Sequence, residues 1–81
     1  MLKDKVVLVT GGAGLIGQEF IRAVIENNGI AIIADINESL GLSVKNEISL
    51  ELNTTNVDFV KLDITSSKSI IKCISFVKNN Y

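Results

Sequence analysis

The 81-residue sequence contains no histidine, proline or tryptophan, and it has one cysteine, Cys73. A single cysteine excludes an intrachain disulfide, and without histidine it leaves no ligand set for a zinc site. No histidine is present to activate the thiol as a nucleophile, so we expect Cys73 to be a small core residue on a helix face. A reducing, cytoplasmic location is the simplest interpretation of this cysteine content.

Long apolar runs and a marked excess of charge are also missing. No run of about 18 apolar residues exists, which argues against a transmembrane helix. Asp4 interrupts the N-terminal basic residues, and glycines break the apolar stretch that follows, which argues against a signal peptide. The net charge of −1 gives no reason to expect nucleic acid or a membrane as a partner. The composition, 47% hydrophobic and 21% charged, predicts a globular chain.

The sequence does contain a regular alternation of strand and helix patterns. Strands are predicted at residues 6–9, 30–34 and 57–62, and helices over residues 14–27, 39–52 and 67–77. Successive β-α-β units imply right-handed crossovers and a parallel sheet. The predicted fold class is therefore α/β: a partial Rossmann fold, or doubly wound parallel sheet, with β-α-β-α-β-α connectivity and strand order 3-2-1.

Apolar spacing predicts which sides of these elements are buried and where the helices begin and end. The continuous apolar run at residues 6–9 is typical of a strand buried on both faces. Asn28-Gly29 is expected to end the first helix, with the glycine in the left-handed conformation. One helical stripe is expected to pack on the sheet, formed by Ile16, Phe20, Ala23 and Val24. The candidate caps of the later helices are Asn37, Ser39, Thr65, Ser66 and Ser67.

The segment between the first strand and the first helix carries the most functional information. It reads Thr10-Gly11-Gly12-Ala13-Gly14-Leu15-Ile16-Gly17, which matches both G-x-G-x-x-G and T-G-x-x-G-x-x-G. Glycine lets a pyrophosphate approach the backbone, and the free N–H groups of a helix's first turn donate to its oxygens. Gly17 is expected to let the helix pack close to the strand. All of these residues are candidates for cofactor binding; the alternative is a glycine-rich loop without a ligand.

A Walker phosphate-binding loop, G-x-x-x-x-G-K-[ST], is a competing interpretation of the same glycines. Gly12 and Gly17 have the required spacing, but Gln18-Glu19 follows where Lys-Ser/Thr is needed. The lysine that meets the β- and γ-phosphates is missing, and a carboxylate is present instead. The sequence therefore argues against ATP or GTP hydrolysis.

Two aspartates follow the second and third predicted strands. Asp35 lies about twenty residues after the glycine turn, where a carboxylate accepts hydrogen bonds from ribose hydroxyls and repels a 2′-phosphate. Ile36 follows with no arginine to bind that phosphate, so NAD is favoured over NADP. Asp63 is placed to accept from the adenine amino group, and the N–H of Ile64 to donate to a ring nitrogen. Each aspartate has an alternative interpretation as a turn or helix-cap residue.

Together these segments resemble the short-chain dehydrogenase/reductase family over nearly the whole chain. The resemblance is carried by residues 5–10, the glycine turn at residues 10–17, Asp35, and Leu62-Asp63-Ile64-Thr65. It implies a Rossmann sheet, NAD(P)(H) as cofactor, hydride transfer at an alcohol or carbonyl, and a full-length protein that forms homo-oligomers. The sequence is also similar to bacterial reductases of flagellin or surface-sugar modification.

The catalytic residues that the resemblance implies, a serine, a Tyr-x-x-x-Lys pair and an Asn-Asn-Ala-Gly segment, do not occur, so no residue is assigned as catalytic. We expect residues 1–81 to be the N-terminal NAD(P)-binding part of a truncated Rossmann domain, with the catalytic half absent. The first strand then has no neighbour on its far side and exposes an apolar edge. Two alternatives stay open: the cofactor-binding part of a sugar-nucleotide epimerase or dehydratase, and a non-catalytic nucleotide-binding module.

Overall fold

Three parallel strands form the sheet, with β2 in the middle. In the computed structural model, which describes residues 1–81, the elements are β1 (Val6–Thr10), α1 (Leu15–Glu26), β2 (Ile30–Asp35), α2 (Glu38–Glu51), β3 (Val57–Lys61) and α3 (Ser67–Asn80). The order across the sheet is β1-β2-β3, which is the predicted order 3-2-1 read from the opposite edge. The predicted α/β fold class is therefore confirmed.

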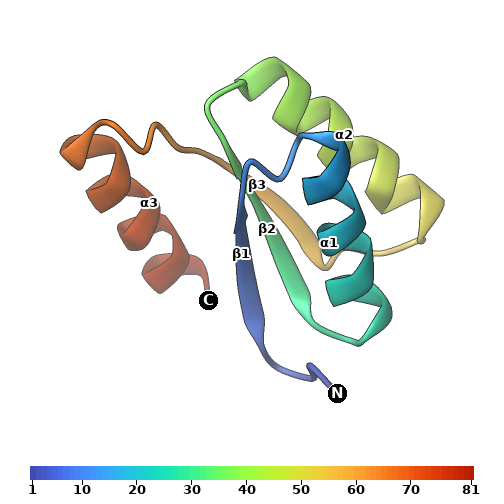
Figure 1. Cartoon of the computed structure of the whole chain (residues 1–81). Coiled ribbons are helices and arrows are strands. Elements are labelled where there is room, and N and C mark those ends of the chain that lie inside the picture. Colours follow the sequence, from blue (N-terminus) through green and yellow to red (C-terminus); the bar gives the residue numbers. More distant parts are fainter.

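The helices cover both faces of this sheet. Figure 1 shows α1 and α2 together on one face and α3 on the other. The larger core, on the face of α1 and α2, is formed by Ala13, Ile21, Val24, Ala31, Ile33, Val44, Ile48 and Val57. A smaller cluster on the face of α3 is formed by Ala34, Leu62 and Cys73. The chain thus changes from one face of the sheet to the other after β3.

The central strand β2 is the most buried element because it has a neighbour on each side and helices over both faces. Residues 31–34 are all buried. Ala31 and Ile33 belong to the larger core and Ala34 to the smaller cluster, the alternation expected of a strand. The register pairs Thr10 with Ala34 and Asp35 with Lys61. The carboxyl ends of all three strands therefore meet at one edge of the sheet.

β1 is an edge strand, and the prediction that it is buried on both faces is wrong. It pairs only with β2. Val6, Val7 and Val9 are half-buried, whereas Leu8 is 37% exposed. A parallel strand needs a neighbour and a helix on each side to be fully covered, and β1 has a single neighbour. The open apolar edge expected for this strand is present.

The buried side of α1 also differs from the predicted stripe. Ile21 and Val24 pack in the core, but Ile16 and Phe20 are 76% and 60% exposed, and Ala23 is exposed too. The helix carries apolar residues on two sides, and only the side that includes Ile21 faces the sheet. A spacing of four residues fits either side, so the sequence pattern did not distinguish them.

α1 ends where it was predicted to end, but in the Asn28-Gly29 pair that follows it the asparagine, not the glycine, adopts the left-handed conformation. Asn28 adopts the left-handed conformation, with φ of 70°. Gly29 is required for space, because a Cβ there would lie 2.9 Å from Cγ1 of Val24 and 3.1 Å from Cβ of Leu2. Asparagine tolerates a positive φ better than most residues, which leaves the glycine free to serve the packing.

The caps of α2 and α3 lie among the predicted candidates. Oδ1 of Asn37 accepts the N–H of Leu40 at 3.0 Å, and Oγ of Ser66 accepts the N–H of Ser69 at 3.2 Å. Cys73 on α3 is 4% exposed, so the prediction of a small core residue is confirmed. None of the three helices has the length and apolar character needed to cross a membrane.

Candidate nucleotide-binding site

A cleft of about 440 Å³ lies where the three strands end. It is lined by Thr10, Gly11, Ala34, Asp35, Ile36, Leu62, Asp63, Ile64 and Thr65. These residues come from three separate segments that the parallel sheet brings to one edge. In open α/β sheets, ligands bind in crevices at the carboxyl ends of the strands. Half of the residues predicted for cofactor binding lie here; the others belong to the glycine turn and the start of α1.

The glycine turn folds tightly against the end of β2. Gly11 has a φ of 68°, which glycine adopts without steric cost. Its N–H donates to the carbonyl of Ala34 at 2.7 Å, and the N–H of Gly12 donates to the same oxygen at 3.4 Å. A Cβ at Gly12 would lie only 2.9 Å from the carbonyl oxygen of Val9. The turn lies this close to the sheet because Gly12 carries no side chain, whereas Gly11 supplies the positive φ.

Gly17 is needed for a contact with the turn and not, as predicted, for one with the strand. A Cβ at Gly17 would overlap the carbonyl oxygen of Gly11 and would lie 2.7 Å from Cα of Gly12. Gly14 is less confined, since the nearest atom to its Cβ position is 3.4 Å away. The first turn of α1 therefore rests directly on the residues that precede it.

The N-terminus of α1 offers hydrogen-bond donors without partners. Gly14 is the N-cap and has no side chain to accept from the helix. The backbone N–H groups of Leu15, Ile16 and Gly17 donate to no acceptor in the structure. No acidic residue lies in the first turn. Free N–H groups and the positive end of the helix dipole make this a suitable place for an anion.

The Asp35 carboxylate is held by two backbone donors. Oδ2 accepts the N–H of Ala13 at 3.1 Å, and Oδ1 accepts the N–H of Asn37 at 3.0 Å. A carboxylate has about four acceptor sites, so each oxygen keeps capacity for a further donor. The contact with Ala13 was not predicted, because it depends on the path of the glycine turn. It joins two predicted site elements, the glycine turn and Asp35, to each other.

Asp63, which follows β3, also lines the cleft, and its carboxylate is only partly engaged. Its Oδ1 accepts both the hydroxyl and the N–H of Thr65, at 2.6 and 2.9 Å. These hydrogen bonds, with the charge of Lys61, hold the pKa of Asp63 below its usual value. The other oxygen, Oδ2, has no partner, and neither has the N–H of Ile64. Asp63 is not the N-cap of α3, because Ser66 has that role.

A second cleft of about 470 Å³ lies beside the first, along the open edge of β1. It is lined by Leu8, Val9, Thr10, Gly11, Ile16, Gly17 and Phe20. Thr10 and Gly11 line both clefts, so the glycine turn forms the ridge between them. The predicted residues Ile16 and Gly17 thus face this second space. No group of three or more His, Cys, Asp or Glu side chains that could hold a metal ion is present.

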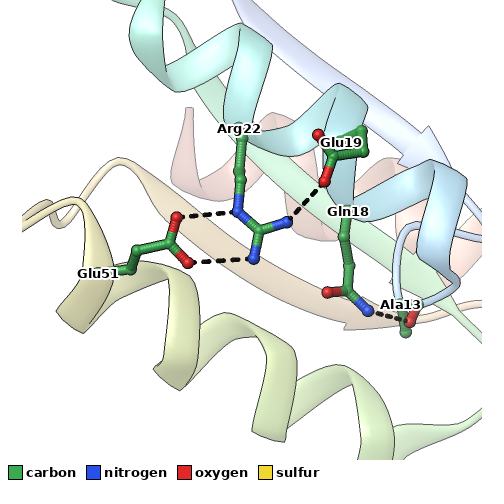
Figure 2. A network of polar contacts seen from close by, with 5 residues as sticks. All are labelled: Ala13, Gln18, Glu19, Arg22 and Glu51. Carbon is green, nitrogen blue, oxygen red and sulfur yellow. Dashed lines mark hydrogen bonds and ion pairs between the residues drawn. The ribbon is translucent and has the colours of Figure 1, made fainter.

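Polar side chains connect α1 to the glycine turn and to the neighbouring helix α2 (Figure 2). Arg22 makes a two-pronged contact with the carboxylate of Glu51 on α2, at 3.0 and 3.1 Å, and a further bond to Glu19 at 3.2 Å. The side-chain amide of Gln18 donates to the carbonyl of Ala13 at 3.0 Å. None of these contacts was predicted. Charge alone does not indicate which residues of two helices face each other.

Comparison with known families decides the classification. Residues 5–81 match the family model described as short chain dehydrogenase. The chain belongs to the short-chain dehydrogenase family. Members of this family are oxidoreductases with a Rossmann-type nucleotide-binding fold, and they generally bind NAD(P). The resemblance predicted from the glycine turn and the two strand-end aspartates is therefore confirmed at the level of the family.

Individual relatives agree with this classification. The post-translational flagellin modification protein A of Campylobacter coli is 39% identical over 70 residues, which cover 86% of this chain and 27% of that protein. The 3-hydroxyacyl-CoA dehydrogenase type-2 of Drosophila melanogaster is 33% identical over 81 residues, which cover 100% of this chain and 30% of that protein. The predicted similarity to flagellin-modification proteins is confirmed. The chain spans less than a third of the length of these relatives.

Solved structures share the fold. Menthone neomenthol reductase from Mentha piperita superposes with a TM-score of 0.90 at 21% identity, covering 100% of this chain and 28% of its own. A short chain dehydrogenase from Shigella flexneri superposes with a TM-score of 0.86 at 24% identity, covering 99% of this chain and 32% of its own. At these identities the likeness concerns the fold alone, and it confirms the partial Rossmann arrangement.

Proposed function

We infer that residues 1–81 bind the adenosine and pyrophosphate portion of NAD(H), in an oxidoreductase that transfers hydride between this cofactor and an alcohol or carbonyl. The observation that carries this inference is the distribution of polar groups around the glycine turn and the adjoining cleft. N–H donors lie at the start of α1, and carboxylates lie at the ends of β2 and β3. A dinucleotide is anionic at its pyrophosphate and offers hydroxyl and amino donors at its ribose and adenine.

The start of α1 supports a pyrophosphate site. The free N–H groups of Leu15, Ile16 and Gly17 point outward from a helix whose first turn has no carboxylate. Gly14 is exposed and carries no side chain, so an anion can come within hydrogen-bonding distance of the backbone at the start of α1. Helix N-termini of this kind bind phosphate through several weak donors together rather than through one charged side chain.

The end of β2 supports NAD rather than NADP. Asp35 keeps acceptor capacity on both oxygens, which suits the 2′- and 3′-hydroxyls of a ribose. The negatively charged 2′-phosphate of NADP would be repelled by the Asp35 carboxylate. None of the nine residues lining the cleft is lysine or arginine, so nothing there offsets the repulsion. Ile36, next to Asp35, adds only apolar surface.

The end of β3 supports an adenine site. Oδ2 of Asp63 and the N–H of Ile64 are an unpaired acceptor and an unpaired donor on adjacent residues. The exocyclic amino group and a ring nitrogen of adenine would pair with them in that order. The apolar side chains of Ile36 and Ile64, which both line the cleft, are suited to contact the faces of the base.

The matched family model favours a dehydrogenase over the sugar-nucleotide epimerase or dehydratase and over a non-catalytic module. None of the residues assigned above performs the chemical step, so their role is to hold the cofactor. We expect residues 1–81 to act as the cofactor-binding part of a larger Rossmann domain. Homo-oligomerisation of the whole protein is expected for the same family reason.

Calorimetric titration of the complete gene product with NAD⁺ and NADP⁺ tests this assignment. We expect NAD⁺ to bind about tenfold more tightly or better, and Asp35→Asn to reduce that ratio, because the variant loses one acceptor and the negative charge. Asp4→Asn is the matched control. It removes the same charge at an exposed position with φ of 63°, far from the cleft, where asparagine is well tolerated. If neither nucleotide binds, the assignment is refuted. If NAD⁺ and NADP⁺ bind with equal affinity, the preference for NAD is refuted.

A further inference from the structure

We propose that Gln18 is a positioning residue for the nucleotide, because its side-chain amide and the Asp35 carboxylate together hold both polar backbone groups of Ala13. The N–H of Ala13 donates to Oδ2 of Asp35 at 3.1 Å, and the carbonyl of Ala13 accepts from Nε2 of Gln18 at 3.0 Å (Figure 2). The proposal rests on the proposed function, since it concerns how the pyrophosphate-binding turn is held in place.

Ala13 is the buried point of the turn, which makes both contacts important. It is 1% exposed and belongs to the larger core. A buried backbone N–H or carbonyl without a partner costs free energy, so each group must find one inside the protein. One partner comes from the end of β2 and the other from the first turn of α1. The two bonds fix the turn between the sheet and the helix.

The bond from Gln18 also affects which donors remain for a ligand. In a regular helix that began one residue earlier, the carbonyl of Ala13 would accept the N–H of Gly17, four residues later. Here the first bond of the helix runs from the N–H of Gln18 to the carbonyl of Gly14, at 2.9 Å. The side chain of Gln18 satisfies Ala13 instead, and the N–H of Gly17 stays free. The glutamine thereby leaves an unpaired donor at the anion site.

Residue 18 must be a neutral donor to fill this role. A neutral amide supplies a donor to the carbonyl of Ala13 and adds no charge beside the anion site. A glutamate would place an acceptor against an acceptor and a negative charge near the pyrophosphate. A Walker loop has its phosphate-binding lysine at this position, directly after the last glycine. In this chain Gln18 occupies that position. Its side chain binds the turn, so the backbone N–H groups are the donors for the ligand.

Nucleotide binding by Gln18 variants of the complete gene product tests the proposal. We expect Gln18→Ala to weaken binding of NAD⁺ and ADP-ribose about threefold to tenfold, as for loss of one hydrogen bond, and to change adenosine binding less than about twofold. Asn46→Ala is the control, because it removes a side-chain amide from an exposed helical position without a hydrogen-bond partner. Unchanged NAD⁺ and ADP-ribose affinities in Gln18→Ala, or equal losses for all three ligands, would overturn the proposal.

Gln18→Glu gives a readout that a general loss of stability would not produce. At about pH 7 its carboxylate cannot donate, and we expect NAD⁺ binding at least as weak as in Gln18→Ala. As the pH falls towards the carboxyl pKa, about 4.3 in model peptides and raised beside an acceptor, the acid regains a donor. Affinity relative to the wild type at the same pH should then recover. If the ratio of the NAD⁺ affinity of Gln18→Glu to that of the wild type stays constant with pH, the donor role of residue 18 is contradicted.

Amide hydrogen exchange of Ala13, measured without nucleotide, separates this proposal from the proposed function. We expect the Ala13 N–H to exchange several-fold faster in Gln18→Ala than in the wild type, while an amide in the middle of β2, such as that of Ile32, is unaffected. If the wild type binds no nucleotide, the proposed function fails, and the exchange data still decide whether Gln18 holds the turn. Equal Ala13 exchange in both proteins would show that it does not.

Discussion

The hydroxyl of Tyr81 donates to Oδ2 of Asp58 at 2.8 Å, which connects the end of α3 to the edge strand β3. Lys45 on α2 reaches Oδ1 of the same carboxylate at 3.4 Å. Asp58 therefore contacts helices that lie on opposite faces of the sheet. Partial burial alone would raise the pKa of Asp58, but the hydrogen bonds from the Phe59 N–H, Tyr81 and Lys45 outweigh it and lower the pKa.

Titration of Tyr81 is the first prediction from this contact. Burial, followed by the hydrogen bond and the charge of Asp58, raises the pKa of Tyr81 from 10.0 to about 12. Because the pKa is higher in the folded state, the contact stabilises the fold fully below about pH 10 and loses its effect as the pH rises through about 12. Tyr81 is the only tyrosine and tryptophan is absent, so phenolate absorbance of the 81-residue chain reports it directly.

The Asp58→Asn variant tests the cause of that shift. Without the carboxylate charge, the titration midpoint should move down towards 10.0, whereas Asp4→Asn should leave it near the wild-type value. A wild-type midpoint already close to 10.0 would mean that Tyr81 and Asp58 are not in contact in solution.

Substitution of Gly17 is predicted to be far more harmful than substitution of Gly14. Alanine improves helix propensity by about 1 kcal/mol over glycine. At Gly17 the new Cβ collides with the backbone of Gly11 and Gly12, which cannot rotate away, so we expect a net loss of at least about 2 kcal/mol. At Gly14, where the nearest atom is 3.4 Å from the Cβ position, the change should stay within about 1 kcal/mol. Urea denaturation of both variants measures the difference; equal stabilities would contradict the close contact.

Gly41 on α2 is predicted to be coupled to Phe59 on β3. A Cβ at Gly41 would overlap the Phe59 ring, so Gly41→Ala should destabilise the fold by roughly 1–3 kcal/mol despite its better helix propensity. Phe59→Leu removes the ring and makes room for the methyl group. The double variant should therefore be more stable than the sum of the two single effects predicts, which a double-mutant cycle in urea measures. Simple additivity would show that the ring moves aside at little cost.

The sequence predicted the parts of the site that depend on local backbone chemistry. Gly11 needs a positive φ, and Gly12 and Gly17 need the absence of a Cβ. These requirements are visible as glycine at fixed spacing after an apolar strand. Asp35 and Asp63 were found because the carboxyl ends of parallel strands meet at one edge of the sheet.

Contacts that depend on three-dimensional paths were not predicted. The bonds of Ala13 to Asp35 and to Gln18 require the exact course of the turn. The buried side of α1 was assigned wrongly because Ile21 and Ile16 both lie on apolar sides, and the open edge of β1 leaves the second side uncovered. At the end of α1, asparagine took the conformation expected of glycine because Gly29 is held between Val24 and Leu2.

Each strand of this sheet pairs only with strands adjacent to it in the sequence. During synthesis the N-terminal part of a chain emerges first, and contacts between neighbouring segments need only short loops to close. β1 is therefore already synthesised when β2 emerges, and the hydrogen bond between Ala13 and Asp35 joins two residues made before α2. Asp63 arrives only after β3. The segments that line the cleft are thus synthesised at different stages of translation, the glycine turn first.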